Sequence, residues 1–533
     1  MQALKSKINK NTEQYRENYA NMLKLVEKLE KHLEESRFEG KEEHIQRARK
    51  RGKLLARERI ELLLDRDSPF LELLPLSGMN RKGGFGAGGT NVSGIGLVSG
   101  KLCMINSNVG TRKGGSVDYH TGFKGLRIND ITRENKLPCI NLVESGGANL
   151  PDQATIFNYG GAGFREISRR SQLGLPTISV VFGNATAGGA YIPGMSDYAI
   201  FQKQQAKVFL AGPPLVKMAT NEIATDEELG GAEMHSRISG VSDYLAEDEL
   251  DGIRLAREIM ETISISKPHL IPEDEIQEPL YDAEELLGIV SADIKIPFDA
   301  REIIARVVDG SQFSEFKPEY GRTLVTGWAK IHGYPVGILA NNGVIFSEDA
   351  NKGAQFIQLS NKNDIPLIFM QNITGFMVGK QYEEGGIIKN GAKLINAVSN
   401  SKVPAITLMI GSSYGAGNYG MNGLSYQPRF LFTYPNHKIG VMGSEQLAGV
   451  MDIIQRASAE SLGQEFDEQK AKIAKMMLIQ EAESKASAWH STSELWDDGV
   501  IDPRQTRNYL GFSLAVVYNQ PIEGAEGYGV FRM

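Results

Sequence analysis

Two stretches of the chain decide how it folds: LPTISVVFGNATAGGAY at residues 175–191 and VPAITLMIGSSYGAGNY at residues 403–419. Each starts beside a proline, continues as a short apolar run rich in β-branched residues, and ends in a glycine-rich turn. Such a run, ended by glycine, predicts a buried strand followed by a tight turn. The interval from Pro176 to Pro404 equals the interval from Gly189 to Gly417, and we call it the repeat interval.

A second pair of stretches matches at the same spacing. LPCINLVESGGA begins at Leu137 and IPLIFMQNITGF begins at Ile365, again one repeat interval later. A third pair, ERIELLLDRDSPFLEL from Glu58 and EIIARVVDGSQFSEF from Glu302, is separated by a longer interval and therefore needs an insertion or a deletion. Two long matches in one order at one spacing indicate a duplicated α/β domain, each copy running strand, glycine turn, helix, strand, glycine turn.

The remaining segments fit around this repeat. We expect an N-terminal helical segment at 1–65, a first α/β domain at 66–275 and a second at 290–533, with the acidic segment 266–286 as a linker. A heptad-like stripe predicts a helix over 13–35 that packs on the domain or on a neighbouring subunit. A basic helical stretch follows from His44 to Arg59, either a solvated face or a site for an anionic group such as a CoA phosphate. The predicted strands of the first domain are 94–98, 101–107, 138–143, 176–182 and 206–210.

The composition excludes several classes of protein. With 41% hydrophobic and 23% charged residues, the 533-residue chain has an ordinary globular composition. Its net charge of −7 disfavours a nucleic-acid partner. Cys103 and Cys139 stand alone in apolar runs, so we expect buried free thiols and no metal site. No secretory signal and no apolar run of about 18 residues is seen, which predicts a cytoplasmic protein with no membrane partner.

Glycine turns of this kind have a chemical use. When a strand ends in a turn and a helix follows, the first amides of that helix have no partner within it and point beyond the strand end. They can form an oxyanion hole made of backbone, and removing one such donor typically costs on the order of 10²–10³ in rate. The candidates are Gly188, Gly189 and Ala190 in the first copy and Gly415, Ala416 and Gly417 in the second. The plainer interpretation is that the glycines only allow tight strand–helix packing.

Two other motifs compete with the turns. Gly411-Ser412-Ser413-Tyr414-Gly415 is a literal G-x-S-x-G, with Asp497 or Glu445 and His437 or His490 downstream as possible triad partners. The corresponding stretch of the first copy, GNATA at 183–187, has no serine, so a hydrolase does not explain the matched glycines. His235 lies near a glycine turn, and a structural role is expected for it.

The chain resembles the carboxyltransferase β subunits of biotin-dependent acyl-CoA carboxylases, which belong to the crotonase superfamily. The resemblance covers about residues 45–533 and rests on these segments: RGKLLARERIELLLD (51–65), VESGGANLPDQ (143–153), TAGGAYIPGMSD (186–197), VFLAGPPLVKMAT (208–220), ELGGAEMHSRISGVSDYLAEDE (228–249), QNITGFMVG (371–379), GSSYGAGNYGMNG (411–423) and YGVFRM (528–533). SGGANLP, QNITGFM, GAGNYGM and the FRM terminus look most like the 3-methylcrotonyl-CoA and geranyl-CoA carboxylase branch. The propionyl-CoA branch matches less well.

The resemblance implies two crotonase-like domains, each a β-sheet superhelix flanked by helices. It implies that the first domain binds the acyl-CoA thioester and the second binds carboxybiotin. The amides of Gly188–Ala190 then hold the thioester enolate, and those of Gly415–Gly417 hold the ureido oxygen of biotin. The cofactor-binding residues carried over by motif are Ser145, Gly146, Gly147, Ala148, Phe376, Tyr414 and Asn418. No protein base is implied, because decarboxylated biotin takes the substrate proton.

The resemblance also implies partners. The family forms a hexameric core, α6β6 with α subunits that provide the biotin carboxylase and the biotinyl carrier. This chain shows no ATP-site signature, and Ala474-Lys475-Met476-Met477 only partly imitates a biotinylation site, so we interpret it as helix surface. If the protein is eukaryotic, the mitochondrial matrix is the expected compartment, although no transit peptide is seen.

The sequence departs from the family pattern at two places. FNYGGAGFREISRRS (157–171) differs from the methylcrotonyl enzymes around the acyl pocket, so the substrate is the least determined part of the prediction. The four-cysteine zinc ribbon of many bacterial acetyl-CoA carboxylase β subunits is also missing. The alternatives are a propionyl-CoA, acetyl-CoA or other acyl-CoA substrate, the carboxyltransferase of a biotin-dependent decarboxylase, and a non-catalytic CoA-binding scaffold.

Overall fold

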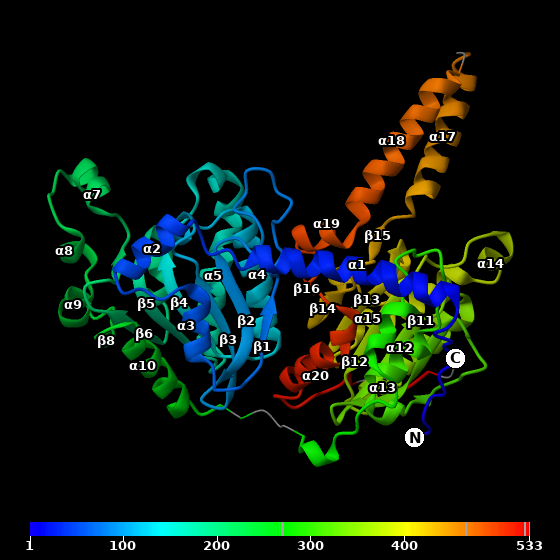
Figure 1. Cartoon of the computed structure of the whole chain (residues 1–533), viewed down its shortest axis with the longest axis horizontal. Helices are drawn as coiled ribbons and strands as arrows, with labels where there is room; N and C mark the ends of the chain where they lie inside the picture. Colours follow the sequence, from blue (N-terminus) through cyan, green and yellow to red (C-terminus); the bar gives the residue numbers. More distant parts are fainter. Residues whose placement is uncertain (266, 268–270, 464–465, 527–528, 532–533) are drawn as a thin grey trace.

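The computed structural model describes every residue except 266, 268–270, 464–465, 527–528 and 532–533. The described residues form two eight-stranded sheets, one in each half of the chain, with helices around them (Figure 1). The strands of the N-terminal half are β1 (Phe70–Leu73), β2 (Asn91–Val98), β3 (Lys101–Asn108), β4 (Cys139–Ser145), β5 (Thr177–Thr186), β6 (Tyr198–Gln202), β7 (Lys207–Phe209) and β8 (Tyr244–Ala246). The strands of the C-terminal half are β9 (Ser314–Glu315), β10 (Leu324–Ile331), β11 (Tyr334–Asn341), β12 (Leu367–Ile373), β13 (Ala405–Tyr414), β14 (Phe430–Thr433), β15 (Lys438–Gly440) and β16 (Gly499–Val500).

The helices divide in the same way. The N-terminal half contains α1 (Glu13–Ser36), α2 (Glu42–Lys50), α3 (Ala56–Leu63), α4 (Tyr119–Glu134), α5 (Gln153–Gln172), α6 (Tyr191–Gly194), α7 (Pro213–Thr220), α8 (Asp226–Gly230), α9 (Ala232–Met234) and α10 (Glu249–Thr262). The C-terminal half contains α11 (Leu286–Ile289), α12 (Ala300–Val307), α13 (Ser347–Lys362), α14 (Lys380–Glu384), α15 (Ile387–Asn400), α16 (Ala416–Gly420), α17 (Ser444–Ser461), α18 (Glu468–Ala486), α19 (Ala488–Ser493) and α20 (Thr506–Val517).

The two sheets have the same topology. One runs β1-β2-β3-β4-β5-β6-β8 with β7 paired to β5, and the other runs β9-β10-β11-β12-β13-β14-β16 with β15 paired to β13. In each sheet the first three strands are antiparallel and all later pairs are parallel. α13 begins and ends one repeat interval after α4, and α12 begins and ends after α3 at the longer interval that separates Glu302 from Glu58. The predicted duplication is therefore confirmed, including the weaker match that needed a change in spacing.

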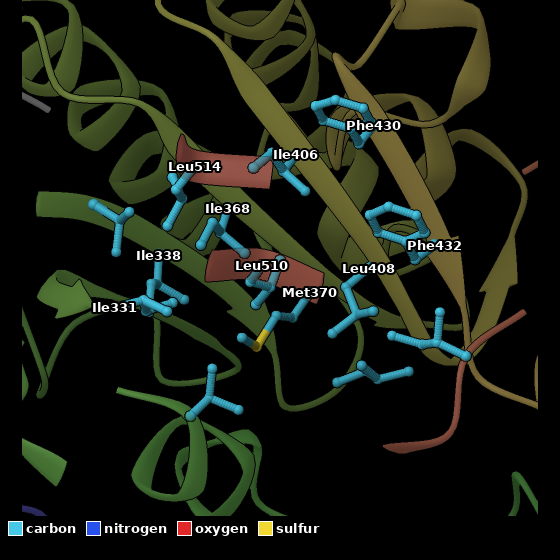
Figure 2. Close-up of a cluster of buried hydrophobic side chains, with 14 of the residues drawn as sticks. Ile331, Ile338, Ile368, Met370, Ile406, Leu408, Phe430, Phe432, Leu510 and Leu514 are labelled. Atoms are coloured by element: carbon cyan, nitrogen blue, oxygen red, sulfur yellow. The ribbon is translucent and has the colours of Figure 1, made fainter. Parts of the chain in front are cut away.

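Alternation along the strands builds the core of the C-terminal half. Successive strand side chains point to opposite faces. Ile368 and Met370 of β12 therefore lie on one face of the sheet, where they pack in one cluster with Leu510 and Leu514 of α20 (Figure 2). Leu367 and Phe369 belong instead to a cluster under α13 and α15, on the opposite face. The core on the α20 side continues into the N-terminal half, where it includes Leu73, Met104 and Ile131. One apolar core thus joins the two halves.

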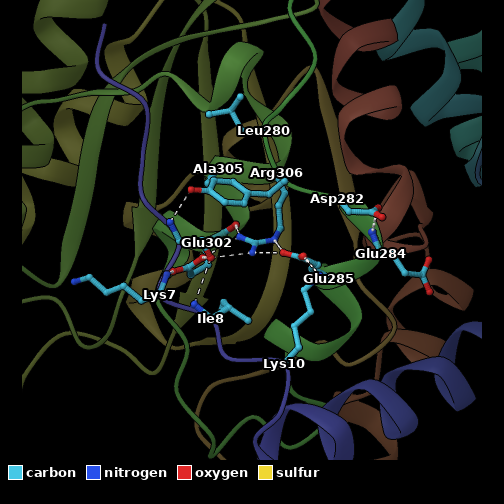
Figure 3. A network of polar contacts seen from close by, with 12 residues as sticks. Lys7, Ile8, Lys10, Leu280, Asp282, Glu284, Glu285, Glu302, Ala305 and Arg306 are labelled. Atoms are coloured by element: carbon cyan, nitrogen blue, oxygen red, sulfur yellow. Dashed lines mark hydrogen bonds and ion pairs between the residues drawn. The ribbon is translucent and has the colours of Figure 1, made fainter.

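The N-terminal segment packs on the C-terminal half. The Ser6 hydroxyl donates to Glu302 at 2.6 Å, and Lys10 pairs with Glu285 (Figure 3). Arg306, which is fully buried, pairs with both of these carboxylates. Helix α1 follows and buries Met22, Val26 and Leu29, which confirms that the predicted stripe packs on the domain. The predicted linker 266–286 lies partly outside the described residues. Its later part includes Glu285, which takes part in this network.

The predicted basic helix from His44 to Arg59 is wrong as a single helix. α2 ends at Lys50 and α3 begins at Ala56, because Gly52 takes a left-handed conformation with φ of 71° between them. The break separates two groups of basic side chains. Arg57 and Arg59, on α3, pair with internal carboxylates, whereas those on and after α2 face a cavity.

Candidate functional site

The two glycine turns have the same backbone form. β5 leads into a 3-10 turn at Ala187–Ala190, and β13 leads into Gly415 and α16. Gly415 follows Ala187 by one repeat interval, and the φ angles of the two residues are 57° and 53°. A left-handed residue at this position turns the chain sharply at the strand end. Gly188 and Ala416, the residues that follow, are both exposed.

Each turn is braced by the loop after the neighbouring strand. Gly147 and Gly375, also one repeat interval apart, have φ of 86° and 126°. Parallel bridges join Val117 to Ala148 in one half and Ile345 to Phe376 in the other. A Cβ on Gly147 would lie 3.0 Å from the Thr186 oxygen, so the loop needs glycine to approach the turn. The same frame holds both turns.

The predicted binding residues of the first half form this bracing loop. The buried Ser145 hydroxyl donates to the Gly115 oxygen at 2.7 Å and accepts from the Gly147 amide at 3.2 Å. The Gly146 amide donates to the Gly114 oxygen at 2.8 Å. These donors are used within the loop, and Gly146 and Ala148 are exposed. The loop lies directly beside the Gly188–Ala190 turn.

The predicted residues of the second half also surround their turn. Asn418 donates from Nδ2 to Ser413 Oγ at 2.8 Å. Phe376 packs against α15 and α16, where a Cβ on Gly391 or Gly420 would lie 3.0 or 3.3 Å from its ring. Tyr414 is buried, and this burial raises its pKa to about 12. These side chains fix the turn, whereas Ala416 and Tyr419 reach the surface.

The serine-nucleophile alternative does not fit the geometry. Ser413 is fully buried, and its hydroxyl donates to Gln371 Oε1 at 2.6 Å while it accepts from Asn418. His437 lies next to Gly411 but bonds the Gly411 oxygen through Nδ1 at 2.7 Å. Burial lowers the pKa of His437 to about 4. No hydrogen bond among the described residues joins Ser413 to a histidine.

The other singled-out residues have structural roles. His235 is buried between the Val208 oxygen at 2.7 Å and the Ser239 hydroxyl at 2.6 Å, which confirms the expected role. Cys103 and Cys139 are buried and free, also as predicted. Lys475 lies on the exposed surface of α18. Within the described part of the chain, no group of three or more His, Cys, Asp or Glu side chains could hold a metal ion, and no helix could cross a membrane.

A basic cavity of about 570 Å³ lies beside the first turn's bracing loop. Its basic side chains come from α2, from the residues on either side of α2 and from the loop before α4; they are Lys41, His44, Arg47, Arg51, Lys53, Arg112 and Lys113. At its base, Glu144 pairs with Lys53 and with Arg59. Burial opposes ionisation of Glu144, but Arg59 and Lys53 outweigh it and lower its pKa.

Arg112, Lys113 and Glu144 were missed in the sequence. An insertion in the first copy is the signal that could have identified Arg112 and Lys113. Asn108 and Val117 correspond to Asn341 and Ile345 of the second half, and the chain between the first two is longer than the chain between the second two. The extra residues carry Arg112 and Lys113 into the cavity. Among the described residues, the insertion and the two basic side chains that it carries belong to the first half.

Comparison with known proteins adds an independent line of evidence. Residues 47–526 match the family model described as "Carboxyl transferase domain". The probable biotin-dependent acyl-coenzyme A carboxylase beta2 subunit of Mycobacterium tuberculosis is 54% identical over 531 residues, covering 99% of this chain and 100% of that protein. The mitochondrial methylcrotonoyl-CoA carboxylase beta chain of Dictyostelium discoideum is 48% identical over 532 residues, covering 99% and 90%. The crystal structure of the P. aeruginosa geranyl-CoA carboxylase beta subunit superposes with a TM-score of 0.89 at 42% identity, covering 99% and 100%.

Proposed function

This chain belongs to the carboxyl transferase family, among the beta subunits of biotin-dependent acyl-CoA carboxylases, and from this premise we propose that it transfers a carboxyl group from carboxybiotin to an acyl-CoA. The observation that carries the proposal is the pair of turns with one backbone form, Ala187–Ala190 and Gly415–Gly417, at the ends of equivalent strands. Two reacting molecules each develop a negative oxygen in this reaction, and each turn can hold one.

We assign one reactant to each half of the chain. The amides of Gly188–Ala190 hold the thioester oxygen while the acyl group loses a proton, and those of Gly415–Gly417 hold the ureido oxygen of biotin. Carboxybiotin, a substrate brought by another chain, supplies the CO₂ and then the base. The protein therefore positions both reactants and stabilises their charge, which agrees with the structural use made of Ser413, His235 and His437.

The basic cavity supports an acyl-CoA in the first half, where the segment 1–65 and the domain at 66–275 line the cavity together. CoA carries phosphates, and guanidinium and ammonium groups bind phosphate through charge-assisted hydrogen bonds. Arg47, Arg51 and Lys113 line the cavity. Glu144, its acidic group, is neutralised by Arg59 and Lys53, so the net field of the cavity stays positive. We assign biotin to the second half, at 290–533, which has an equivalent turn.

The active site is proposed to form between two chains. β5 and β13, which carry the turns, lie in different halves (Figure 1), and no hydrogen bond or ion pair of the described residues links the two turns. Tyr191 follows the first turn, Tyr419 follows the second, and both are exposed. Other exposed apolar side chains are Met218 and Ile223 in the first half and Ile453 and Met477 of α17 and α18 in the second. Exposed apolar patches mark protein interfaces. They fit a homo-hexameric core that docks α subunits carrying biotin carboxylase and biotin.

The proposed substrate is 3-methylcrotonyl-CoA or a related branched or longer acyl-CoA. The support is the likeness to methylcrotonoyl-CoA and geranyl-CoA carboxylase subunits at 48% and 42% identity. Selection among acyl chains comes from pocket volume, at about 1–3 kcal/mol per methylene.

The test is carboxyl transfer by the purified chain in the reverse direction. A carboxylated acyl-CoA and free biotin are mixed with it, and release of the decarboxylated acyl-CoA is followed with time. We expect biotin-dependent turnover, and a chain that binds CoA esters without turnover would be a scaffold. A panel of acyl-CoAs with the reconstituted holoenzyme then ranks the substrates, and preference for propionyl-CoA would contradict the proposed branch.

A further inference from the structure

A second cavity of the first half lies between the sheet and helices α4 and α5. Its volume is about 240 Å³. The sheet side presents the carboxamides of Asn91, Asn106 and Asn141, from β2, β3 and β4. Asn129 of α4 and Arg170 of α5 complete the polar wall. Such a row of polar groups is unusual in a space between a sheet and its covering helices.

The second half shows what this space holds when it is only a core. The five corresponding residues there are Leu324, Leu339, Phe369, Ile357 and Val398. All five are buried and belong to one apolar cluster under α13 and α15. The same fold is therefore filled with apolar side chains in one half, while the other half keeps four asparagines and an arginine around empty space.

The helices keep this space open. Gly125 of α4 and Gly160 of α5 line the cavity, and a Cβ at either position would meet nothing within 4 Å. Glycine within a helix is less favourable than alanine. Neither glycine has a steric reason within the described residues, so the room next to them is available to another molecule.

Arg170 is a buried charge that forms no ion pair with the described residues. It is 2% exposed, and its guanidinium donates to Asn129 Oδ1 at 2.9 Å and to Thr177 Oγ1 at 3.5 Å, both neutral. Its Nε has no partner in the described part of the chain. Glu166, one turn earlier on α5, pairs with arginines other than Arg170. A buried guanidinium is normally paired with an anion.

The cavity begins beside the first glycine turn. Phe164 and Ile192 line it, and the Phe164 ring lies 3.5 Å from where a Cβ on Gly188 would stand. An acyl group whose thioester oxygen sits at Gly188–Ala190 therefore has this space next to it. Because a carboxylate matches a guanidinium in charge and in planar geometry, a distal carboxylate is the group that Arg170 lacks.

We propose that the cavity between α4, α5 and the sheet binds the distal end of the acyl group and that this end carries a carboxylate, so that the preferred ligands are thioesters of dicarboxylic acids. This inference rests on the proposed binding of acyl-CoA in the first half, and within that function it replaces 3-methylcrotonyl-CoA by a dicarboxylic thioester as the preferred ligand.

The test compares glutaryl-CoA with pentanoyl-CoA, whose acyl groups both contain five carbons, by calorimetric binding to the full-length chain, with free CoA as reference. We expect glutaryl-CoA to bind at least tenfold more tightly than pentanoyl-CoA. Arg170→Met should remove this preference by weakening glutaryl-CoA alone. Val398→Met, at the corresponding position of the second half, should change neither ligand.

A second variant covers the case in which Arg170→Met does not fold. Gly125→Leu fills the cavity and leaves Arg170 in place, and it should weaken both thioesters relative to free CoA without lowering the thermal midpoint. Pentanoyl-CoA binding as tightly as glutaryl-CoA to the unmodified chain would overturn the inference and leave the proposed function intact. If neither thioester nor CoA binds, the proposed function itself fails.

Discussion

The two halves of the chain share a backbone frame but differ in what fills it. Ala187 matches Gly415 and Gly147 matches Gly375 in left-handed conformation, whereas the space under the helices is a polar cavity in one half and an apolar core in the other. Each buried aliphatic or aromatic side chain stabilises a fold by about 1.5–3 kcal/mol. The first half lacks that stabilisation at the five corresponding positions, and the proposed ligand binding in the cavity gives a reason for the loss.

The largest effect should come from breaking one turn. Gly417→Val adds a side chain whose Cβ would lie 2.6 Å from Ile373 Cγ1, so the turn must move. We expect carboxyl transfer to fall by about 10²–10³, while CoA-ester affinity stays within about twofold, measured by steady-state kinetics and by calorimetry. Gly189→Val is the matched variant in the first half, where the nearest atom is 4.0 Å away. It should weaken the CoA ester as well, and equal behaviour of the two variants would refute the two-substrate division.

A pair of buried lysines tests the shared frame. Lys124 and Lys352 occupy corresponding positions, and burial lowers the pKa of each to about 8. The unfolded chain binds the proton up to about pH 10.5, so the cost of each buried charge is full below pH 8 and disappears toward pH 10.5. The difference in unfolding free energy between Lys124→Met and the unmodified chain should change by on the order of 3 kcal/mol over that range.

Lys352→Met should give the same pH dependence, because both lysines have the same lowered pKa. Each variant also loses hydrogen bonds to backbone oxygens. We expect that loss to be constant with pH, so it does not contribute to the change in unfolding free energy with pH. Denaturant unfolding at several pH values measures it. A slope in one half only would mean that the two lysines do not share one environment.

Two aspartates test the frame at a second place. Asp65 accepts from the amides of Ser99 and Gly100, and Asp309 accepts from those of His332 and Gly333. Replacing either by Ala leaves two amides without their acceptor, at about 1–3 kcal/mol. Asp309→Ala should cost more, because its side chain is 8% exposed against 24% for Asp65. Urea unfolding of both variants measures the difference, and a larger loss for Asp65→Ala would reverse the ranking.

The Asp65 carboxylate also predicts an acid limit. Burial acts against its charge, but the Gly100 and Ser99 amides and Arg257 together lower its pKa. Its stabilising contribution is therefore present above the unfolded pKa of about 3.9 and is lost as the pH falls through the folded value. Asp65→Asn should lose this dependence.

The smallest effect should come from the basic cavity of the first half. Arg51→Glu should raise the KM for a CoA ester roughly tenfold, equal to about 1.4 kcal/mol, with little change in kcat. The effect should shrink at high salt, because exposed charges are screened. Lys472→Glu, on the exposed surface of α18, makes the same change of charge and should leave KM unaltered.

Much of the fold was readable because its signals are local. The strand predicted at 176–182 overlaps β5, the helix predicted at 13–35 corresponds to α1, and the match between Glu58 and Glu302 corresponds to α3 and α12. Hydrophobic period and glycine position depend on neighbouring residues, so they survive in the sequence. The Gly188 and Gly415 turns were located for that reason. The substrate roles of the two turns remain predictions that the experiments above address.

The sequence by itself determined the duplication, the two turns and the family, because a repeat interval and a motif are properties of residue order. Only the tertiary structure decided what the residues between them do. In the structure, the basic stretch is divided at Gly52 and the Ser413 hydroxyl is hydrogen-bonded to both Gln371 and Asn418. Arg170 lines a cavity at the position where the second half has Val398. Whether a polar side chain is a surface group, a brace or the wall of a cavity depends on partners distant in sequence, and only packing brings them together.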